Sequence, residues 1–134
     1  MSYRVYDGAA YSSVVDANEE ALVSDINANP GTDEPGIVLR TGKPALLVSE
    51  LLGVLVEKRI VTRAYDASGV PFYWTAGEYA VRVWSRRADA RNWLAANSGK
   101  TVTQMAASLG VHEAIALALA EGLRAEGKAK LVPV

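Results

Sequence analysis

The sequence predicts a mainly α-helical protein with short β-strands, an α+β chain built from two similar units that a long helix joins. Three observations lead to this prediction. A stretch near the middle of the chain has the pattern of two helices around a tight turn, followed by a two-stranded hairpin. A shift of 68 residues superimposes this stretch on the C-terminal part of the chain. Between the two copies, no signal that ends a helix occurs before Ser98-Gly99.

The composition describes a folded chain and excludes several classes of protein. With 134 residues, half of them apolar, the chain can form one ordinary domain or two very small ones. It contains no cysteine, which excludes disulfides and zinc fingers and fits a reducing cytosol. No apolar run approaches the roughly 20 residues that span a bilayer, and residues 1–10 lack the pattern of a signal peptide. We therefore expect a cytoplasmic protein without a membrane partner.

The N-terminal part predicts a strand and a helix. Residues 3–6 can form a short strand, and the Asp-Gly pair at 7–8 can form its turn. A helix is then expected over residues 13–29, closed by the Pro-Gly pair at 30–31.

A short helix, a tight turn and a longer helix follow. Asp33 is a good N-cap residue, and Pro35 lies in the first turn, where a missing N–H costs little. Gly42 can adopt the left-handed conformation that ends a helix, and Pro44 then opens the next one. We expect the longer helix over residues 44–58.

The longer helix and the hairpin after it show clear periodicity. Leu47, Leu51 and Leu55 recur at four-residue spacing and predict one apolar stripe. β-forming residues at 60–65 and 70–74 then flank an Asp-Ala-Ser-Gly turn, which predicts two antiparallel strands.

Residues 41–74, TGKPALLVSELLGVLVEKRIVTRAYDASGVPFYW, resemble the winged helix superfamily of transcription regulators. The resemblance implies a helix-turn-helix with a β-hairpin wing. Together with the repeat it implies two tandem winged helix-turn-helix units, the first over residues 1–75 with an N-terminal extension and the second over residues 76–134.

The second copy has its own signals at the shifted positions. Thr101 and Gln104 predict a capping box, and Gly110 predicts the tight turn. A longer helix is expected over residues 111–126, and a single strand over residues 128–132 replaces the hairpin. The leucine stripe of the first copy falls on Ile115, Leu119 and Leu123.

The segment that joins the units predicts one helix. Thr75 and Glu78 have the spacing of a capping box, and a helix of about six turns can run from there to Asn97. It would serve both as the connector and as the first helix of the second unit.

Basic side chains are the candidates for contacts with double-stranded DNA. Residues 1–36 hold one basic and seven acidic residues, a net charge of −6, so the other 98 residues carry +5. The candidates for phosphate contacts are Lys58, Arg59 and Arg63 at the hairpin, and Arg82, Arg86, Arg87 and Arg91 on the joining helix. The alternative is that these side chains only complement a helix end or pair with nearby carboxylates.

Base readout is less well supported. In the winged helix family the first two turns of the longer helix offer polar or basic side chains to base edges. At the matching positions only Lys43, Ser49 and His112 can contact bases or phosphates, and Glu113 repels phosphate. This departure from the family's pattern argues against sequence-specific recognition.

The helix over residues 44–58 is apolar on nearly all sides. We therefore expect its second face to pack on the other unit or on a second subunit of a homodimer, with a tightly wrapped monomer as the alternative. The predicted interface residues are Leu46, Val48, Leu52 and Val56.

The remaining candidate residues favour structural roles. The aromatic cluster of residues 72–84 is expected to be core rather than a stacking platform for bases. His112 is the only histidine and no phosphate-binding glycine motif occurs, so we expect no catalytic residues, metal or cofactor. Glu19 and Glu20 are expected on a solvated helix face.

Two functions remain from the sequence. The first is a small DNA-binding regulatory protein that contacts the duplex backbone through the hairpin and the joining-helix arginines. The second is a protein-interaction module, an adaptor or an inhibitor, suggested by the apolar longer helix.

Overall fold

The computed structural model describes residues 16–134 of the chain. Within this range 61% of the residues are helical, and two strands form one antiparallel sheet, which confirms a mainly α-helical α+β chain. No single helix of the described part is long and apolar enough to cross a membrane. The expected strand at residues 3–6 and its turn at 7–8 lie outside the described residues.

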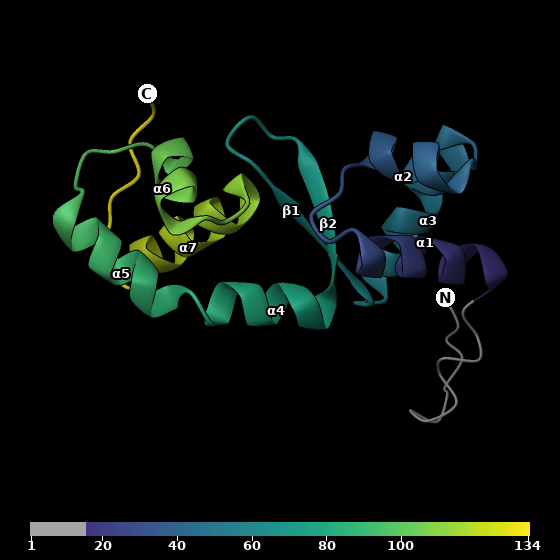
Figure 1. Ribbon diagram of the computed structural model, residues 1–134, viewed down its shortest axis with the longest axis horizontal. Helices are drawn as coiled ribbons and strands as arrows, with labels where there is room; N and C mark the ends of the chain where they lie inside the picture. The colour runs from purple at the N-terminus through teal and green to yellow at the C-terminus, as the bar shows by residue number, and fades with distance from the viewer. Residues whose placement is uncertain (1–15) are drawn as a thin grey trace, which may run out of the picture.

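The elements follow one another with short connections (Figure 1). In chain order they are α1 (Ala17–Ala28), α2 (Glu34–Thr41), α3 (Ala45–Glu57), β1 (Val61–Tyr65), β2 (Pro71–Thr75), α4 (Ala76–Trp84), α5 (Arg87–Ala96), α6 (Val102–Leu109) and α7 (Glu113–Ala125).

The hairpin β1–β2 lies in the middle of the molecule, with α1, α2 and α3 on one side and α5, α6 and α7 on the other (Figure 1). Val61 pairs with Thr75 and Tyr65 with Pro71 at its two ends. Because successive side chains of a strand point to opposite faces, Tyr73 enters the core formed with α1, α2 and α3, and Trp74 enters the core formed with α5, α6 and α7. The hairpin therefore separates two hydrophobic cores and contributes to both.

The internal repeat appears in the element bounds. Adding 68 to the bounds of α2 and α3 gives the bounds of α6 and α7 without any shift. Asp33 and Thr101 occupy the two N-caps, and the predicted box of Thr101 with Gln104 is formed. Gly42 and Gly110 end their helices with φ of 68° and 65°, the left-handed values that the sequence predicted.

Equivalent positions of the two copies are buried, but they are not the predicted stripe of α3. The buried pairs at a spacing of 68 are Leu22 and Ala90, Ile37 and Met105, Val48 and Ala116, Leu52 and Ala120, and Leu55 and Leu123. Of the predicted stripe, Leu55 is buried and the half-buried Leu51 packs against the same core, so the prediction was wrong for Leu47, which is half-buried and not part of that core. The reason is the position of α1 and α2, which both contact the side of α3 that carries Val48 and Leu52.

The predicted joining helix is divided into α4 and α5. Arg86 leaves the helical conformation with φ −104° and ψ 2°. The break allows α4 to pack on the hairpin and α7 while α5 packs on α6 and α7, which one straight helix cannot do. The expected capping box is also absent, because the Thr75 side chain makes no capping hydrogen bond.

The predicted strand over residues 128–132 does not form. Instead, Ala129 and Leu131 pack against the second core. The hairpin turns the face with Trp74 toward this core, and Gly31 and Thr32 occupy the outer edge of β2 through backbone hydrogen bonds to Tyr73. No edge of β2 remains there for a third strand.

Candidate functional site

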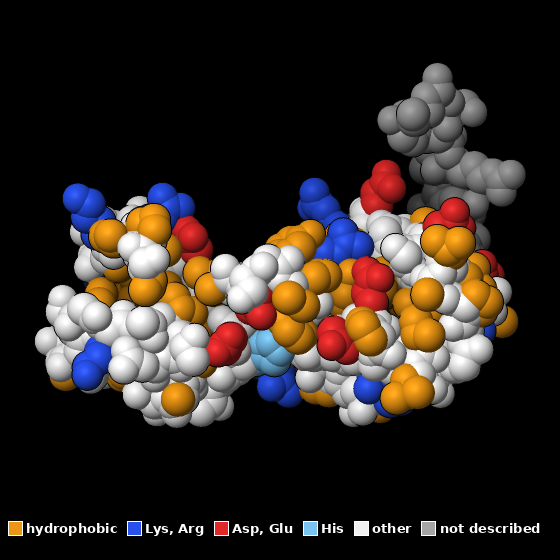
Figure 2. Space-filling view, turned by 90° about the horizontal axis from the view of Figure 1, so that it is seen from above, with side chains coloured by type: hydrophobic (Ala, Val, Ile, Leu, Met, Phe, Trp, Pro, Cys, Tyr) orange, Lys and Arg blue, Asp and Glu red, His pale blue; other side chains and the backbone are white. Residues whose placement is uncertain are grey.

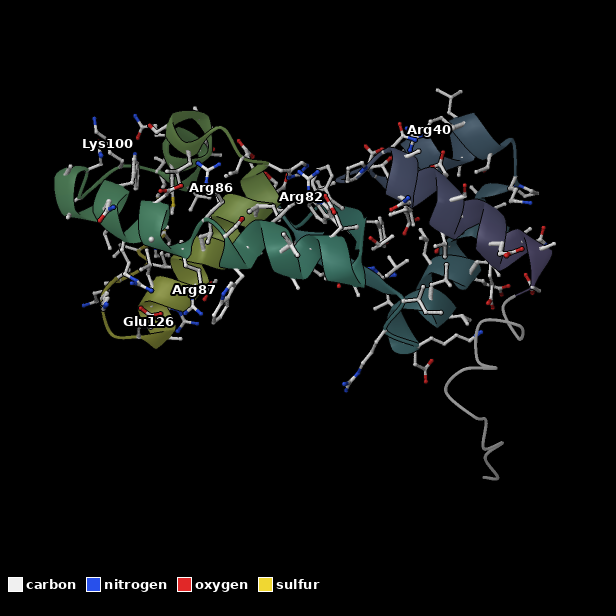
Figure 3. The ribbon with its side chains drawn as sticks, turned by 60° about the horizontal axis from the view of Figure 1, so that its bottom comes forward. Arg40, Arg82, Arg86, Arg87, Lys100 and Glu126 are labelled. Atoms are coloured by element: carbon white, nitrogen blue, oxygen red, sulfur yellow. The ribbon has the colours of Figure 1, made fainter. Side chains whose placement is uncertain are left out.

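All four arginines predicted to contact DNA on the joining segment are in ion pairs. Arg82 donates to Glu78 at 2.8 Å, and Arg86 donates to Asp89 at 2.9 Å and also to the carbonyl of Leu109. In Figure 3, Arg87 lies beside Glu126, to which it donates a hydrogen bond, and Arg91 lies 3.8 Å from the same carboxylate. Each of the four guanidinium groups thus has a carboxylate partner, and Arg87 and Arg91 share one.

The half-buried hairpin arginine Arg63 belongs to a chain of hydrogen-bonded polar groups. Its Nε donates to the Tyr73 hydroxyl at 2.9 Å, and that hydroxyl donates to Glu34 Oε1 at 2.8 Å. Burial, and then the hydrogen bond to Glu34, raise the pKa of Tyr73 to about 12, so the hydroxyl keeps its proton at neutral pH. The guanidinium of Arg63 is thus engaged in joining the hairpin to α2.

Lys58, a further predicted phosphate contact, pairs with a buried carboxylate. Its Nζ lies 3.0 Å from Glu19 Oε2, and Glu19 is only 6% exposed. The expectation that Glu19 lies on a solvated face was wrong, because α1 turns this side chain toward the C-terminal end of α3. Glu20 is exposed. The pair connects α1 to α3.

The other predicted contacts of the first copy lie at the surface. Lys43 donates to Asn18 at 2.8 Å, and Ser49 is exposed on α3. Arg59 is exposed and forms no ion pair with another described residue. Its φ of 62° is in the left-handed region, which ends α3.

His112 has a structural role at the start of α7. Its Nδ1 accepts a hydrogen bond from the Ala114 N–H at 3.0 Å, which caps the helix. Its ring packs against Phe72, with a centroid distance of 4.4 Å, and against Trp74, with a centroid distance of 5.1 Å. Burial lowers the pKa of His112 below its ordinary value.

The start of α7 therefore faces the inside of the molecule. Ala114, Ile115 and Ala116 are all at most 2% exposed, because α7 packs on the hairpin and α4 on one side and on α5 and α6 on the other. His112, which was predicted to contact nucleic acid from this helix, is half-buried, and its ring lies against Phe72 and Trp74. Tyr73 and Trp74 are likewise buried, as expected for aromatic core residues, but Trp84 is 72% exposed, so for this residue the prediction was wrong.

The predicted interface residues of α3 divide into two groups. Val56 is half-buried and packs against the first core. Val48 and Leu52 are fully buried in that core, so these two do not face a second subunit. The prediction failed for them because α1 and α2 use that side of the helix. Leu46 is 84% exposed and remains a candidate interface residue.

Leu46 belongs to an apolar surface that we name the α2–α3 face, formed by Pro35, Val38, Leu39, Ala45 and Leu46. Leu39 is also 84% exposed. A hollow of about 410 Å³ is lined by Glu34 and the first four residues of the face. Figure 2 shows hydrophobic side chains interspersed with acidic ones over the α1–α3 lobe, on the right of the view.

The charges on the outer side of α3 are acidic. Glu50 and Glu57 are both exposed on this helix. Carboxylates at these positions repel phosphate. Leu39 was not among the predicted interface residues. The sequence signal for its exposure is the length of α2, because only one side of a helix of eight residues can reach a core.

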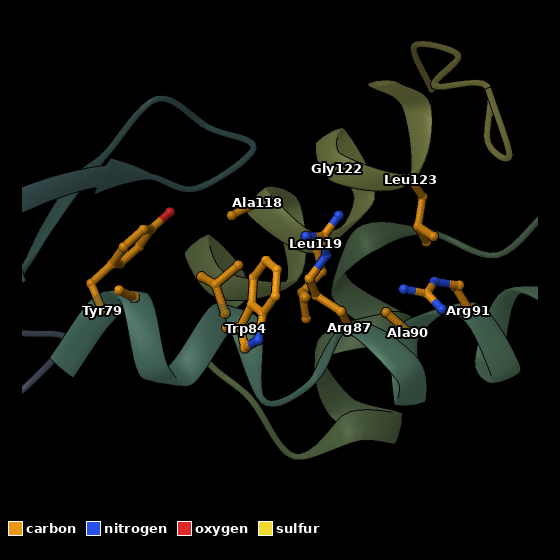
Figure 4. A pocket seen from close by; sticks show the side chains of 11 residues that line it. Tyr79, Trp84, Arg87, Ala90, Arg91, Ala118, Leu119, Gly122 and Leu123 are labelled. Carbon is orange, nitrogen blue, oxygen red and sulfur yellow. The ribbon is translucent and has the colours of Figure 1, made fainter. Parts of the chain in front are cut away.

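A second hollow was not predicted. It lies between α4, α5 and α7, measures about 410 Å³ and is bordered by Trp84, Arg87 and Arg91 (Figure 4). The sequence could not indicate it, because it depends on the break between α4 and α5. Among the described residues, no group of three His, Asp and Glu side chains is placed to hold a metal ion.

Neither a protein family model nor a curated protein matches the sequence of this chain.

Proposed function

We propose that the chain is a tandem winged-helix interaction module that binds a protein partner through the α2–α3 face. The observation that carries the proposal is the difference between two equivalent positions. Leu46 is 84% exposed in the first copy, whereas Ala114, 68 residues later, is 1% exposed. The larger apolar side chain stands at the more exposed position.

The second copy provides an example in which apolar side chains cover the equivalent surface. In that copy, Phe72, Trp74 and their neighbours in the hairpin and α4 cover the start of α7. Within residues 16–134 no equivalent element covers the start of α3. A protein segment with apolar side chains can bury Leu39 and Leu46 there, at about 25 cal/mol for each Å² of apolar surface removed from water.

The charges support a protein rather than DNA. Glu34 lines the hollow beside the face, and Glu50 and Glu57 lie on α3. Most predicted phosphate-binding side chains are engaged inside the chain, as Lys58 and Arg63 show. We therefore expect a partner segment that combines apolar side chains with Lys or Arg.

The test is affinity capture from an extract of the source cells, with cross-linking and identification of the captured protein. Leu46→Glu and Leu39→Glu are expected to abolish capture without loss of folding, because both side chains are exposed. Val132→Glu is the matched control, since Val132 is also apolar and 71% exposed but lies outside the face. Thermal denaturation followed by circular dichroism checks the fold of each variant.

A shortened chain that begins at Asp16 distinguishes binding of a partner to the face from binding of the chain's own residues 1–15. Stronger capture by this shorter chain would mean that these residues compete for the face. Equal capture by Leu46→Glu and Val132→Glu would remove the face from the proposal.

A second candidate is binding to the DNA backbone. The observation in its favour is Arg59, an exposed cation beside the hairpin that pairs with no described carboxylate. The measurement is fluorescence anisotropy of a labelled random duplex at low and near-physiological salt. Arg59→Glu should weaken binding to every duplex and reduce the salt dependence by about one phosphate contact, whereas Arg124→Glu should not. No binding at low salt would eliminate this candidate.

A further inference from the structure

The hollow between α4, α5 and α7 has an apolar floor. Val83 of α4 and Leu119 and Leu123 of α7 line it, together with smaller side chains (Figure 4). Gly122 leaves the floor open, because a Cβ at this position would meet no atom within 4 Å. Its volume of about 410 Å³ is in the range of about 300–1,000 Å³ that holds small organic ligands.

The rim of the hollow is cationic and aromatic. Arg87 and Arg91 are four residues apart on α5, so both line the same side of the hollow. Trp84 is 72% exposed, and the guanidinium carbon of Arg87 lies 4.9 Å from the centre of its ring. A large apolar side chain and two guanidinium groups thus stand at one opening.

One carboxylate at this rim forms ion pairs with three cations. Glu126 accepts from Arg87, and it lies 3.8 Å from Arg91 and 3.7 Å from Lys128. No other ion pair of these three cations occurs among the described residues, so the cluster carries two positive charges more than negative ones. A second carboxylate would reduce this excess to one charge, and guanidinium groups bind carboxylates through two parallel hydrogen bonds.

We infer that this hollow is a binding site for a small amphipathic carboxylate, whose apolar body rests on the floor and whose carboxylate pairs with Arg87 and Arg91. The floor supplies affinity for the apolar body, and the arginines select the acid over a neutral compound of the same length. The inference concerns a surface other than the α2–α3 face and does not depend on the proposed function.

Isothermal titration calorimetry at pH 7.5 tests the site with three probes. We expect sodium octanoate to bind, octan-1-ol to bind at least about tenfold more weakly because it lacks the charge, and sodium acetate to give no heat of binding because it lacks the chain. Equal affinity for octanoate and octan-1-ol, or absence of octanoate binding, would overturn the inference.

Variants distinguish the contribution of the rim to binding from that of the floor. Arg87→Gln combined with Arg91→Gln should weaken octanoate binding by at least about tenfold and leave octan-1-ol unchanged. Gly122→Leu fills the hollow and should weaken both. Glu126→Gln removes the competing carboxylate and should strengthen octanoate binding severalfold.

The matched control is Arg124→Gln, which removes an exposed arginine of α7 that pairs with Glu121 and does not line the hollow. It should bind octanoate as the unmodified chain does. If Arg124→Gln weakens binding as much as the Arg87 and Arg91 double variant, the effect is one of net charge and the site is refuted. Thermal denaturation confirms that each variant is folded.

Discussion

Gly31 lies at the contact between the two halves of the molecule. Its φ is 83°, a value that costs an L-residue about 1–2 kcal/mol. A Cβ at this position would lie 3.2 Å from both the Trp74 and the His112 side chains. Gly31 is therefore required by backbone conformation and by space.

Substitution of Gly31 by alanine should lower the free energy of unfolding by about 2–4 kcal/mol, the sum of the backbone cost and of crowding against Trp74 and His112. Gly99→Ala is the control, because Gly99 has φ 88° but no atom near its Cβ position. It should lose only about 1–2 kcal/mol in urea denaturation. Equal losses in the two variants would show that crowding at Gly31 has no effect.

His112 makes stability depend on pH at the same contact. Its pKa is lowered from 6.5, mainly by burial, although Asp66 and Glu113 act in the opposite direction. As the pH falls through 6.5, the unfolded chain takes up the proton before the folded chain does. The free energy of unfolding should therefore be highest above pH 6.5 and decrease as the pH falls toward the lowered pKa.

Urea denaturation at pH 7.5 and pH 5.0 measures this dependence. His112→Asn keeps an N-cap residue for α7 and removes the imidazole, so part of the difference between the two pH values should disappear. A pH dependence identical in the variant would assign the effect to other groups.

At the scale of the elements, the pair of Lys58 and Glu19 holds α1 against the end of α3. Removing one partner of a buried pair leaves a buried charge, which costs about 3–5 kcal/mol. Because the Lys58 side chain is 28% exposed, we expect Lys58→Met to lower the free energy of unfolding by about 2–3 kcal/mol. Glu19→Leu in the same chain should restore most of this loss.

The comparison is an exposed pair of one basic and one acidic side chain. Arg82 and Glu78 have side chains that are 46% and 45% exposed, so Arg82→Met should change stability by less than about 0.5 kcal/mol. A loss in Lys58→Met as small as that in Arg82→Met would mean that water screens Glu19 in the folded chain.

The whole molecule is held together by the hairpin, whose two faces belong to two cores. Tyr73 and Trp74 are adjacent, and each is at most 1% exposed in a different core. Neither core is complete without the hairpin. We therefore expect residues 16–134 to unfold in one cooperative transition.

Differential scanning calorimetry checks this prediction by the agreement of the calorimetric and van't Hoff enthalpies. Leu22→Ala in the first core and Leu119→Ala in the second should each lower the temperature of the same transition, with losses of about 2–5 kcal/mol. Two separate transitions, each sensitive to only one substitution, would show that the cores unfold independently.

The sequence by itself determined the ends of α2 and α6 and the repeat. Asp33, Gly42, Thr101 and Gly110 act through hydrogen bonds and backbone conformations within a few residues, so their patterns predicted where α2 and α6 begin and end. The shift of 68 residues, read from the sequence, also relates the bounds of α3 to those of α7.

The tertiary structure decided which sides of these elements are covered, because burial depends on neighbours that are distant in sequence. Leu47 and Val48 are equally apolar, and only the positions of α1 and α2 make Val48 the core residue. The partners of Lys58 and Arg63 likewise come from α1 and β2. The opening beside Trp84 exists only because α4 and α5 must turn to pack on different neighbours, a requirement that no local pattern contains.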